Sequence, residues 1–123
     1  MAKASAPVII FSGHSLGAQL AQVLAACYAS LTGRKARVVT FGCPRGAFMG
    51  NLTAGGLVRS GLEAVSFRNF GDPVCEVPPW LIWKHNVSLT TLGDRLVENV
   101  PTMADHSVAL YLSRLKDLEL KLA

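Results

Sequence analysis

The chain has 123 residues, of which 50% are hydrophobic and 16% are charged. This length predicts a single domain spanning residues 1–123, and so apolar a composition excludes intrinsic disorder. The net charge of +4 comes from scattered basic residues, so we expect no nucleic-acid partner and only a mild attraction to anionic surfaces. No apolar run approaches the ~20 residues that cross a bilayer. The N-terminus lacks a secretory signal, which favours a cytoplasmic location without a transmembrane segment.

The first half of the chain is patterned as strand, helix and strand. Val8–Ser12 is a β-branched and aromatic run ending at Gly13, which predicts a buried strand. Leu16–Ser30 is small and apolar nearly all round, as is typical of a helix packed on a sheet, and Gly33 is expected to end it. Arg37–Gly42 is predicted to be the second strand.

The second half continues the same alternation. We expect a strand at Leu62–Phe70, a proline-rich loop at Gly71–Trp80, a further strand at His85–Leu92 and a hairpin return at Gly93–Val100. A helix start at Pro101–Asp105 then leads into a final amphipathic helix at Ser107–Leu122. The glycine-rich segment Pro44–Gly61 has room for one short helix. The order of the elements predicts an α/β fold with a mostly parallel sheet of about four to five strands.

The turn between the first strand and helix carries a motif typical of enzymes. Gly13-His14-Ser15-Leu16-Gly17 fits G-x-S-x-G, the nucleophile elbow, in which a serine sits at a strained strand-to-helix turn. Glycines two positions on either side let the backbone approach closely, and the helix N-terminus favours a developing oxyanion. The alternative is a glycine-flanked turn with no catalytic role.

A serine nucleophile needs a base and an orienting carboxylate, which α/β-hydrolases supply in the order Ser…Asp/Glu…His. Asp72 follows the third strand, and His106 lies near the start of the last helix, so these residues are the predicted partners of Ser15. The alternative role of Asp72 is that of a turn-forming residue before proline. His85 is a competing base.

Three neighbouring polar residues are assigned other roles. We expect His14 to provide packing or polar support, Asp105 to be a helix N-cap, and Asp94 to be a turn residue.

The three cysteines, Cys27, Cys43 and Cys75, form no CxxC pair and no zinc-binding spacing. We therefore expect small buried thiols, with neither a disulfide framework nor a metal site.

Five segments together resemble the class 3 lipases, the fungal triacylglycerol lipase family of α/β-hydrolases, and they occur in the family's order: Val8–Ala21, Val38–Arg45, Phe67–Pro79, His85–Val87 and Asp105–Leu112. The family's catalytic serine, aspartate and histidine match Ser15, Asp72 and His106. The resemblance implies hydrolysis of carboxylic esters, typically acylglycerols, through an acyl-enzyme and without a metal or cofactor. The backbone N–H of Leu16 would be one oxyanion donor.

The chain departs from the family in two ways. Ala18 and Gln19 replace a glycine and a small residue behind the elbow. Family members are also much longer, and the additional part, which precedes Val8, holds upstream strands, a lid and the second oxyanion donor. Loss of one such donor costs ~10²–10³ in rate. The resemblance therefore implies a truncated α/β-hydrolase fold in which the Val8–Ser12 strand forms an edge, and we expect this edge to pair with a second copy or a partner chain.

These departures leave an alternative function open. A weak or inactive lipase-fold remnant would act as a binding or assembly module, or as half of a split enzyme, and acyl transfer is another use of the same nucleophile. Pro78–Trp83 (PPWLIW) is a candidate for exposed apolar contact with lipid, but we expect it to be a loop that plugs the core.

Overall fold

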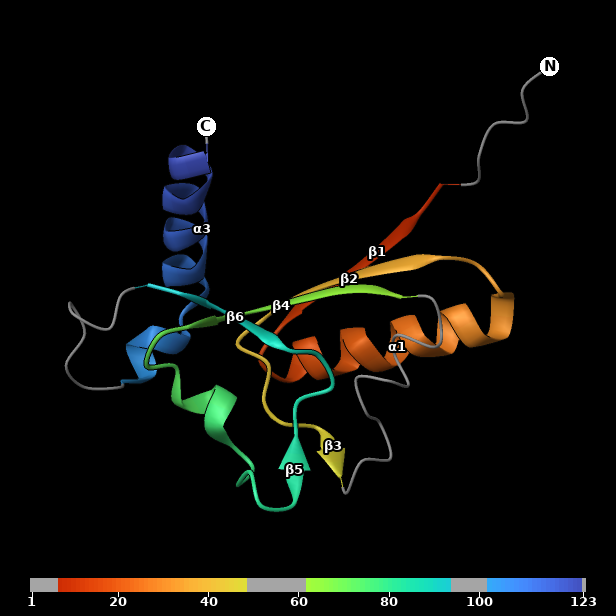
Figure 1. Cartoon of the computed structure of the whole chain (residues 1–123), viewed down its shortest axis with the longest axis horizontal. Helices are drawn as coiled ribbons and strands as arrows, with labels where there is room; N and C mark the ends of the chain where they lie inside the picture. The colour runs from red at the N-terminus through yellow and green to blue at the C-terminus, as the bar shows by residue number, and fades with distance from the viewer. Residues whose placement is uncertain (1–6, 49–61, 94–101, 123) are drawn as a thin grey trace.

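The computed structural model describes residues 7–48, 62–93 and 102–122. In that part of the chain the helices are α1 and α3, with two 3₁₀ turns, η1 and η2, and the strands are β1 to β6 (Figure 1). In chain order the elements are β1 Ile9–His14, α1 Leu16–Thr32, β2 Ala36–Phe41, β3 Ala47–Phe48, β4 Glu63–Asn69, η1 Pro73–Glu76, β5 Trp83–Lys84, β6 Leu89–Leu92, η2 Met103–His106 and α3 Val108–Leu122.

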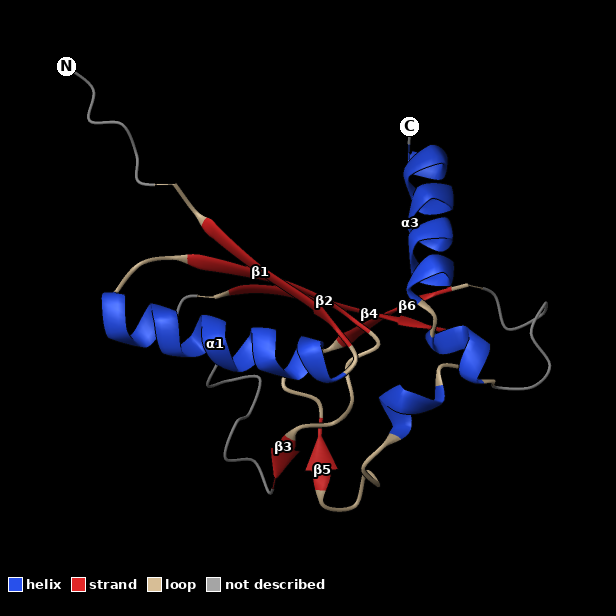
Figure 2. Cartoon of the chain, turned by 180° about the vertical axis from the view of Figure 1, so that it is seen from behind, coloured by secondary structure: helices blue, strands red, loops and turns tan. Residues whose placement is uncertain are grey.

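A parallel sheet organises the described residues. Its strand order is β1-β2-β4-β6, every neighbouring pair is parallel, and a separate antiparallel pair joins β3 to β5. Helix α1 packs on β1 and β2, whereas α3 contacts β4 and β6 (Figure 2 shows the two helices extending to opposite sides of the sheet). This arrangement confirms the predicted α/β class and the predicted mostly parallel sheet.

Small residues explain how closely α1 approaches the sheet. Its buried face consists of four alanines and one glutamine, at Ala18, Ala21, Gln22, Ala25 and Ala29. This face recurs every three or four residues, the helical period. Gly33 ends the helix as expected, because its left-handed φ of 66° lets its N–H donate to the Ala29 carbonyl at 2.9 Å. The core cluster then combines Ala25 and Ala29 with Val38, Leu62 and Val87.

Strand β1 lies at one edge of the sheet among the described residues, as expected for the Val8–Ser12 segment. Val8, Ile9 and Ile10 are exposed there. The pairing of this edge with another chain stays a prediction. No helix in residues 7–48, 62–93 and 102–122 is long and apolar enough to cross a membrane.

Several sequence predictions about the fold differ from the structure. The Val8–Ser12 strand was expected to be buried, but Val8, Ile9 and Ile10 are exposed because the strand lies at the sheet edge among the described residues. The expected strand His85–Leu92 is shortened to its second half. β6 begins only at Leu89, because the Asn86 amide turns inward and donates to the side-chain oxygens of Gln19 and Gln22 at 3.1 and 3.2 Å. The proline-rich loop contains η1. The PPWLIW loop does not plug the core, because Trp80 is 70% exposed.

Two further predictions fall partly or wholly outside the described residues. The hairpin return after Gly93 lies in residues 94–101, and most of the glycine-rich segment lies in residues 49–61.

Candidate active site

Ser15 is the single residue between β1 and α1. Its φ of 58° and ψ of −127° make it the one non-glycine residue with positive φ among those described. Such strain persists only where the surroundings fix it. Here the Ser15 N–H donates to the Phe41 carbonyl at 3.0 Å, and the Ser15 carbonyl accepts from the Ala18 N–H at 3.0 Å. The backbone thus adopts a strained strand-to-helix turn with the serine at its apex.

The two glycines of the motif have different roles. A Cβ on Gly13 would lie 2.2 Å from the Gly17 carbonyl oxygen, so a glycine is needed where β1 passes under the first turn of α1. A Cβ on Gly17 would meet nothing within 4 Å. The expectation that both glycines permit close approach is therefore right for Gly13 and wrong for Gly17.

This difference makes a matched pair of stability predictions. Gly13→Ala should lower the free energy of unfolding by about 3 kcal/mol, because neither backbone can move without displacing α1. Gly17→Ala should raise it by roughly 1 kcal/mol, since alanine loses less backbone entropy in a helix. Urea titration followed by circular dichroism measures both. Equal effects of the two substitutions would show that the close approach at Gly13 is not sterically limiting.

Asp72 and His106 lie in contact although 34 residues separate them in sequence. The His106 Nδ1–H donates to the carboxylate, with Nδ1 at 3.0 Å from Oδ1 and 2.9 Å from Oδ2. The Asp72 side chain is fully buried and that of His106 is 12% exposed. Gly42, just after β2, makes room for the pair: a Cβ there would lie 2.9 Å from the His106 ring.

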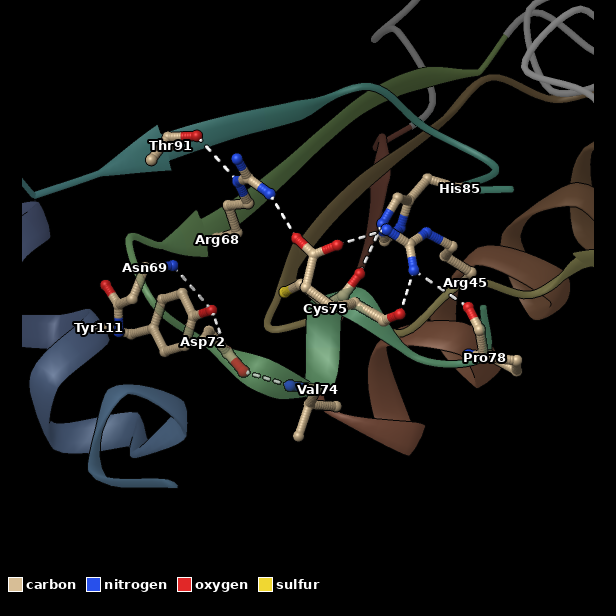
Figure 3. A network of polar contacts seen from close by, with 11 residues as sticks. Arg45, Arg68, Asn69, Asp72, Val74, Cys75, Pro78, His85, Thr91 and Tyr111 are labelled. Atoms are coloured by element: carbon tan, nitrogen blue, oxygen red, sulfur yellow. Dashed lines mark hydrogen bonds and ion pairs between the residues drawn. The ribbon is translucent and has the colours of Figure 1, made fainter. Parts of the chain in front are cut away.

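Two further donors fix the Asp72 carboxylate (Figure 3). The Val74 N–H donates to Oδ1 at 2.9 Å from within η1, and the Tyr111 hydroxyl donates to Oδ2 at 2.5 Å from α3. The Tyr111 oxygen also accepts from the Asn69 N–H at 2.9 Å. Burial raises the pKa of Tyr111 above its ordinary range, so the hydroxyl keeps its proton and remains a donor.

Sequence reasoning missed Tyr111 as a site residue. It occupies the apolar stripe of the last helix, where a tyrosine is usually interpreted as core. The only available signal was that a buried tyrosine hydroxyl needs a polar partner.

His14 contacts the backbone that carries His106. Its Nε2–H donates to the His106 carbonyl at 2.7 Å, and the two ring centroids are 4.4 Å apart. The nucleophile elbow is thereby joined directly to the η2 turn.

The structure does not join Ser15 to His106 by a hydrogen bond. Within the described ranges, the Ser15 Oγ has no hydrogen-bond partner. Such contacts are commonly loose without substrate. Leu16 opens α1, so its N–H has no acceptor within the helix and is available to an oxyanion.

The competing residues are engaged elsewhere. His85 Nε2–H donates to the Cys75 carbonyl at 2.9 Å, and burial lowers the pKa of His85. Asp105 is not the N-cap; Thr102 holds that position, and Asp105, three residues on, accepts from the Thr102 N–H at 2.8 Å in a capping box. Asp94 lies outside the described residues.

The cysteines depart in part from the expectation of buried thiols. Cys43 and Cys75 are buried, but Cys27 is exposed, because it lies on the outer face of α1. All three are free thiols. No group of three or more metal-ligating side chains occurs in the described segments.

Burial of the two inner thiols predicts a loss of stability at alkaline pH. Desolvation raises the pKa of Cys43 and of Cys75 from 9.0 to about 12. Unfolded thiols ionise near pH 9, whereas the folded ones keep their protons. The free energy of unfolding is therefore unaffected by the ionisation of these thiols below pH 9. Between pH 9 and 12 it falls by on the order of 4 kcal/mol per thiol. Urea titrations across this range should show a shallower decline for Cys75→Ala. The exposed Cys27 provides the matched control, Cys27→Ala. If the two variants changed the pH dependence of stability equally, burial of Cys75 would not be its cause.

Comparison with known proteins identifies one family. Residues 1–82 match the family model described as Lipase (class 3). The matched region contains Ser15 and Asp72, whereas His106 lies beyond it and is paired with Asp72 by the fold. No curated protein matches the chain significantly. Because the match covers two thirds of the sequence, the chain belongs to the class 3 lipase family.

Proposed function

We propose that this protein is a serine carboxylic-ester hydrolase that acts on esters such as acylglycerols through Ser15, His106 and Asp72. The observation that carries the proposal is the buried contact between His106 Nδ1 and Asp72. Asp72 follows the carboxyl end of β4, and Ser15 forms its strained turn at the carboxyl end of β1. Family membership supports a lipase-like hydrolase in general. The geometry supports the assignment of roles.

The roles follow from which atoms are already engaged. Asp72 fixes the Nδ1–H tautomer of His106, which leaves Nε2 unprotonated and able to accept the Ser15 proton as Oγ attacks the ester carbonyl. Asp72 stabilises the imidazolium that forms, while the Leu16 N–H donates to the oxyanion. His106 then protonates the departing alcohol, and water, activated by the same imidazole, releases the acid from the acyl-enzyme.

The position of His14 adds support to this scheme. Its hydrogen bond to the His106 carbonyl ties the η2 turn to the residue next to the nucleophile. Small shifts of the base relative to Ser15 are therefore resisted by a direct contact rather than by loop packing alone. Such positioning matters because a misplacement of about 1 Å costs on the order of 10²-fold in rate.

Covalent labelling tests the proposal without requiring turnover. A fluorophosphonate probe should give one adduct on the folded chain, which peptide mass spectrometry should locate on Ser15. Ser12, three residues away and exposed, is an internal control within the same region. His106→Ala should slow the labelling by at least about 10²-fold. A folded chain that resists the probe, or that labels Ser12 as readily as Ser15, would instead support a non-catalytic binding module.

A further inference from the structure

A polar cleft of about 420 Å³ lies on the surface between β4, η1 and β6. The polar side chains that line it come from separate segments of the chain and are Arg45, Arg68, Glu76, His85, Ser88 and Thr91. The described residues that line it include no member of the proposed triad. The cleft is therefore a feature that the proposed ester hydrolysis does not use.

Two guanidinium groups share one carboxylate in this cleft. The Arg68 Nη1–H donates to Glu76 Oε1 at 2.9 Å, and the Arg45 Nη2–H donates to Oε2 of the same carboxylate (Figure 3). Arg45 is also held by the carbonyls of Glu76 and Pro78, and its side chain is only 12% exposed. His85 adds no positive charge at neutral pH, because burial lowers its pKa. With two cations facing one anion, the lining of the cleft keeps a net positive charge.

The cleft also retains hydrogen-bond donors that no described residue satisfies. Arg68 donates to Glu76 through Nη1 and to Thr91 Oγ1 through Nε at 3.0 Å, which leaves both N–H groups of its Nη2 without a partner among the described residues. Because Thr91 Oγ1 accepts from Arg68, its own hydroxyl proton is free to donate. Ser88 is exposed and supplies a second hydroxyl. Donors of this kind, spread over two strands and a loop, suit an anion with oxygens in several directions.

We propose that this cleft binds a phosphate group, either inorganic phosphate or the phosphate of a monoester, with Arg68 as its main cationic donor. A guanidinium suits phosphate because its planar fork donates two parallel hydrogen bonds to two oxygens. A tetrahedral phosphate has further oxygens for the hydroxyls of Thr91 and Ser88, whereas a carboxylate has only two oxygens in one plane. Binding of this kind does not involve Ser15, so it stands apart from ester hydrolysis.

Glu76 is the internal competitor of the phosphate group. Its carboxylate lies between the two guanidinium groups that the ligand would contact. The Glu76 side chain is 55% exposed, so it can turn to solvent when a phosphate group enters. Removal of its charge should therefore strengthen phosphate binding. An ion-pair cluster that serves only to hold the chain together would bind no phosphate in any variant.

Isothermal titration calorimetry with methyl phosphate, and separately with inorganic phosphate, tests the site on the full chain. Arg68→Gln should weaken binding at least about tenfold, because charge-assisted hydrogen bonds are lost. Glu76→Gln should strengthen it about fivefold, because the competing negative charge is removed. Arg37→Gln is the matched control: Arg37 also pairs with a glutamate, Glu63, at 2.6 Å, but it does not line the cleft, so affinity should not change.

Acetate tests whether the site selects phosphate, and it should bind at least about tenfold more weakly than methyl phosphate. Equal affinities for acetate and methyl phosphate would overturn the proposal. So would equal losses in Arg68→Gln and Arg37→Gln, or no binding of either phosphate compound at millimolar concentration by protein that circular dichroism shows to be folded.

Two further arms separate this site from ester hydrolysis and identify the source of the phosphate group. Ser15→Ala should bind methyl phosphate with unchanged affinity, so the site does not fall if the chain proves to be inactive on esters. Sedimentation with phosphatidylcholine vesicles that contain phosphatidic acid examines a lipid headgroup as the source. Sedimentation that requires Arg68, from a chain that does not bind methyl phosphate, would support the phosphate site with the headgroup as its ligand.

Discussion

Replacing Ser15 with alanine is expected to lower kcat for ester hydrolysis by up to about 10⁶-fold, to the level supplied by binding and oxyanion donors alone. The nucleophile is the one group in the proposed mechanism that no neighbour can replace. The variant should fold normally, because Ser15 Oγ has no hydrogen-bond partner within the described residues and alanine has the same Cβ at the strained turn. Initial rates on a short-chain 4-nitrophenyl ester measure the effect.

Ser12→Ala is the matched control for this experiment. Ser12 is exposed on β1, so its replacement should leave both rate and stability unchanged. A wild-type rate no higher than that of Ser15→Ala, from protein shown to be folded, would favour a lipase-fold chain that binds without catalysis. A rate that appears only when a second chain is added would favour a split enzyme.

Much of the fold follows from local pattern. The run before Gly13 and the alanine-rich stretch after Leu16 predicted the positions of β1 and α1, because parallel strands and sheet-packed helices are both nearly continuously apolar. The predicted burial of the strand was wrong, because β1 lies at an edge of the sheet among the described residues. Pattern failed at residues 85–88, where alternation favoured a strand. The Asn86 amide is bonded instead to two glutamines of α1, a long-range contact that no local period encodes.

The candidate site could likewise be predicted only in part. The order of the motifs singled out Asp72 and His106, and the fold places His106 Nδ1 2.9 Å from Asp72 Oδ2. The third contact of the carboxylate, from Tyr111, depends on the angle at which α3 crosses the sheet edge, and sequence gives no access to that angle. The exposure of the PPWLIW loop, Pro78–Trp83, was equally hidden. Apolar composition favours burial, whereas Trp80 is 70% exposed and the Arg45 guanidinium donates to the Pro78 carbonyl at the base of the loop.

Asp72→Asn should lower kcat by about 10⁴-fold, as expected when the aspartate of a Ser-His-Asp triad loses its charge. The carboxylate accepts from the Val74 N–H, the Tyr111 hydroxyl and the His106 Nδ1–H. An asparagine has one acceptor oxygen for three donors, so its amide nitrogen must face at least one of them. His106 then either loses its anchor or takes the tautomer with the proton on Nε2, which cannot accept the Ser15 proton.

Asp105→Asn is the control that distinguishes a catalytic carboxylate from a structural one. Asp105 is also buried and adjoins His106, but it accepts from Thr102 in the capping box, where an amide oxygen can substitute, and its other oxygen lies 4.0 Å from the Arg114 guanidinium. Its replacement removes the charge opposite Arg114, so it should cost about 1–3 kcal/mol in stability but less than about tenfold in kcat. Steady-state rates and thermal unfolding, measured on Asp72→Asn and Asp105→Asn, separate the loss of activity from the loss of stability. If Asp105→Asn lost as much activity as Asp72→Asn at equal stability, Asp72 would not be the carboxylate that orients the base.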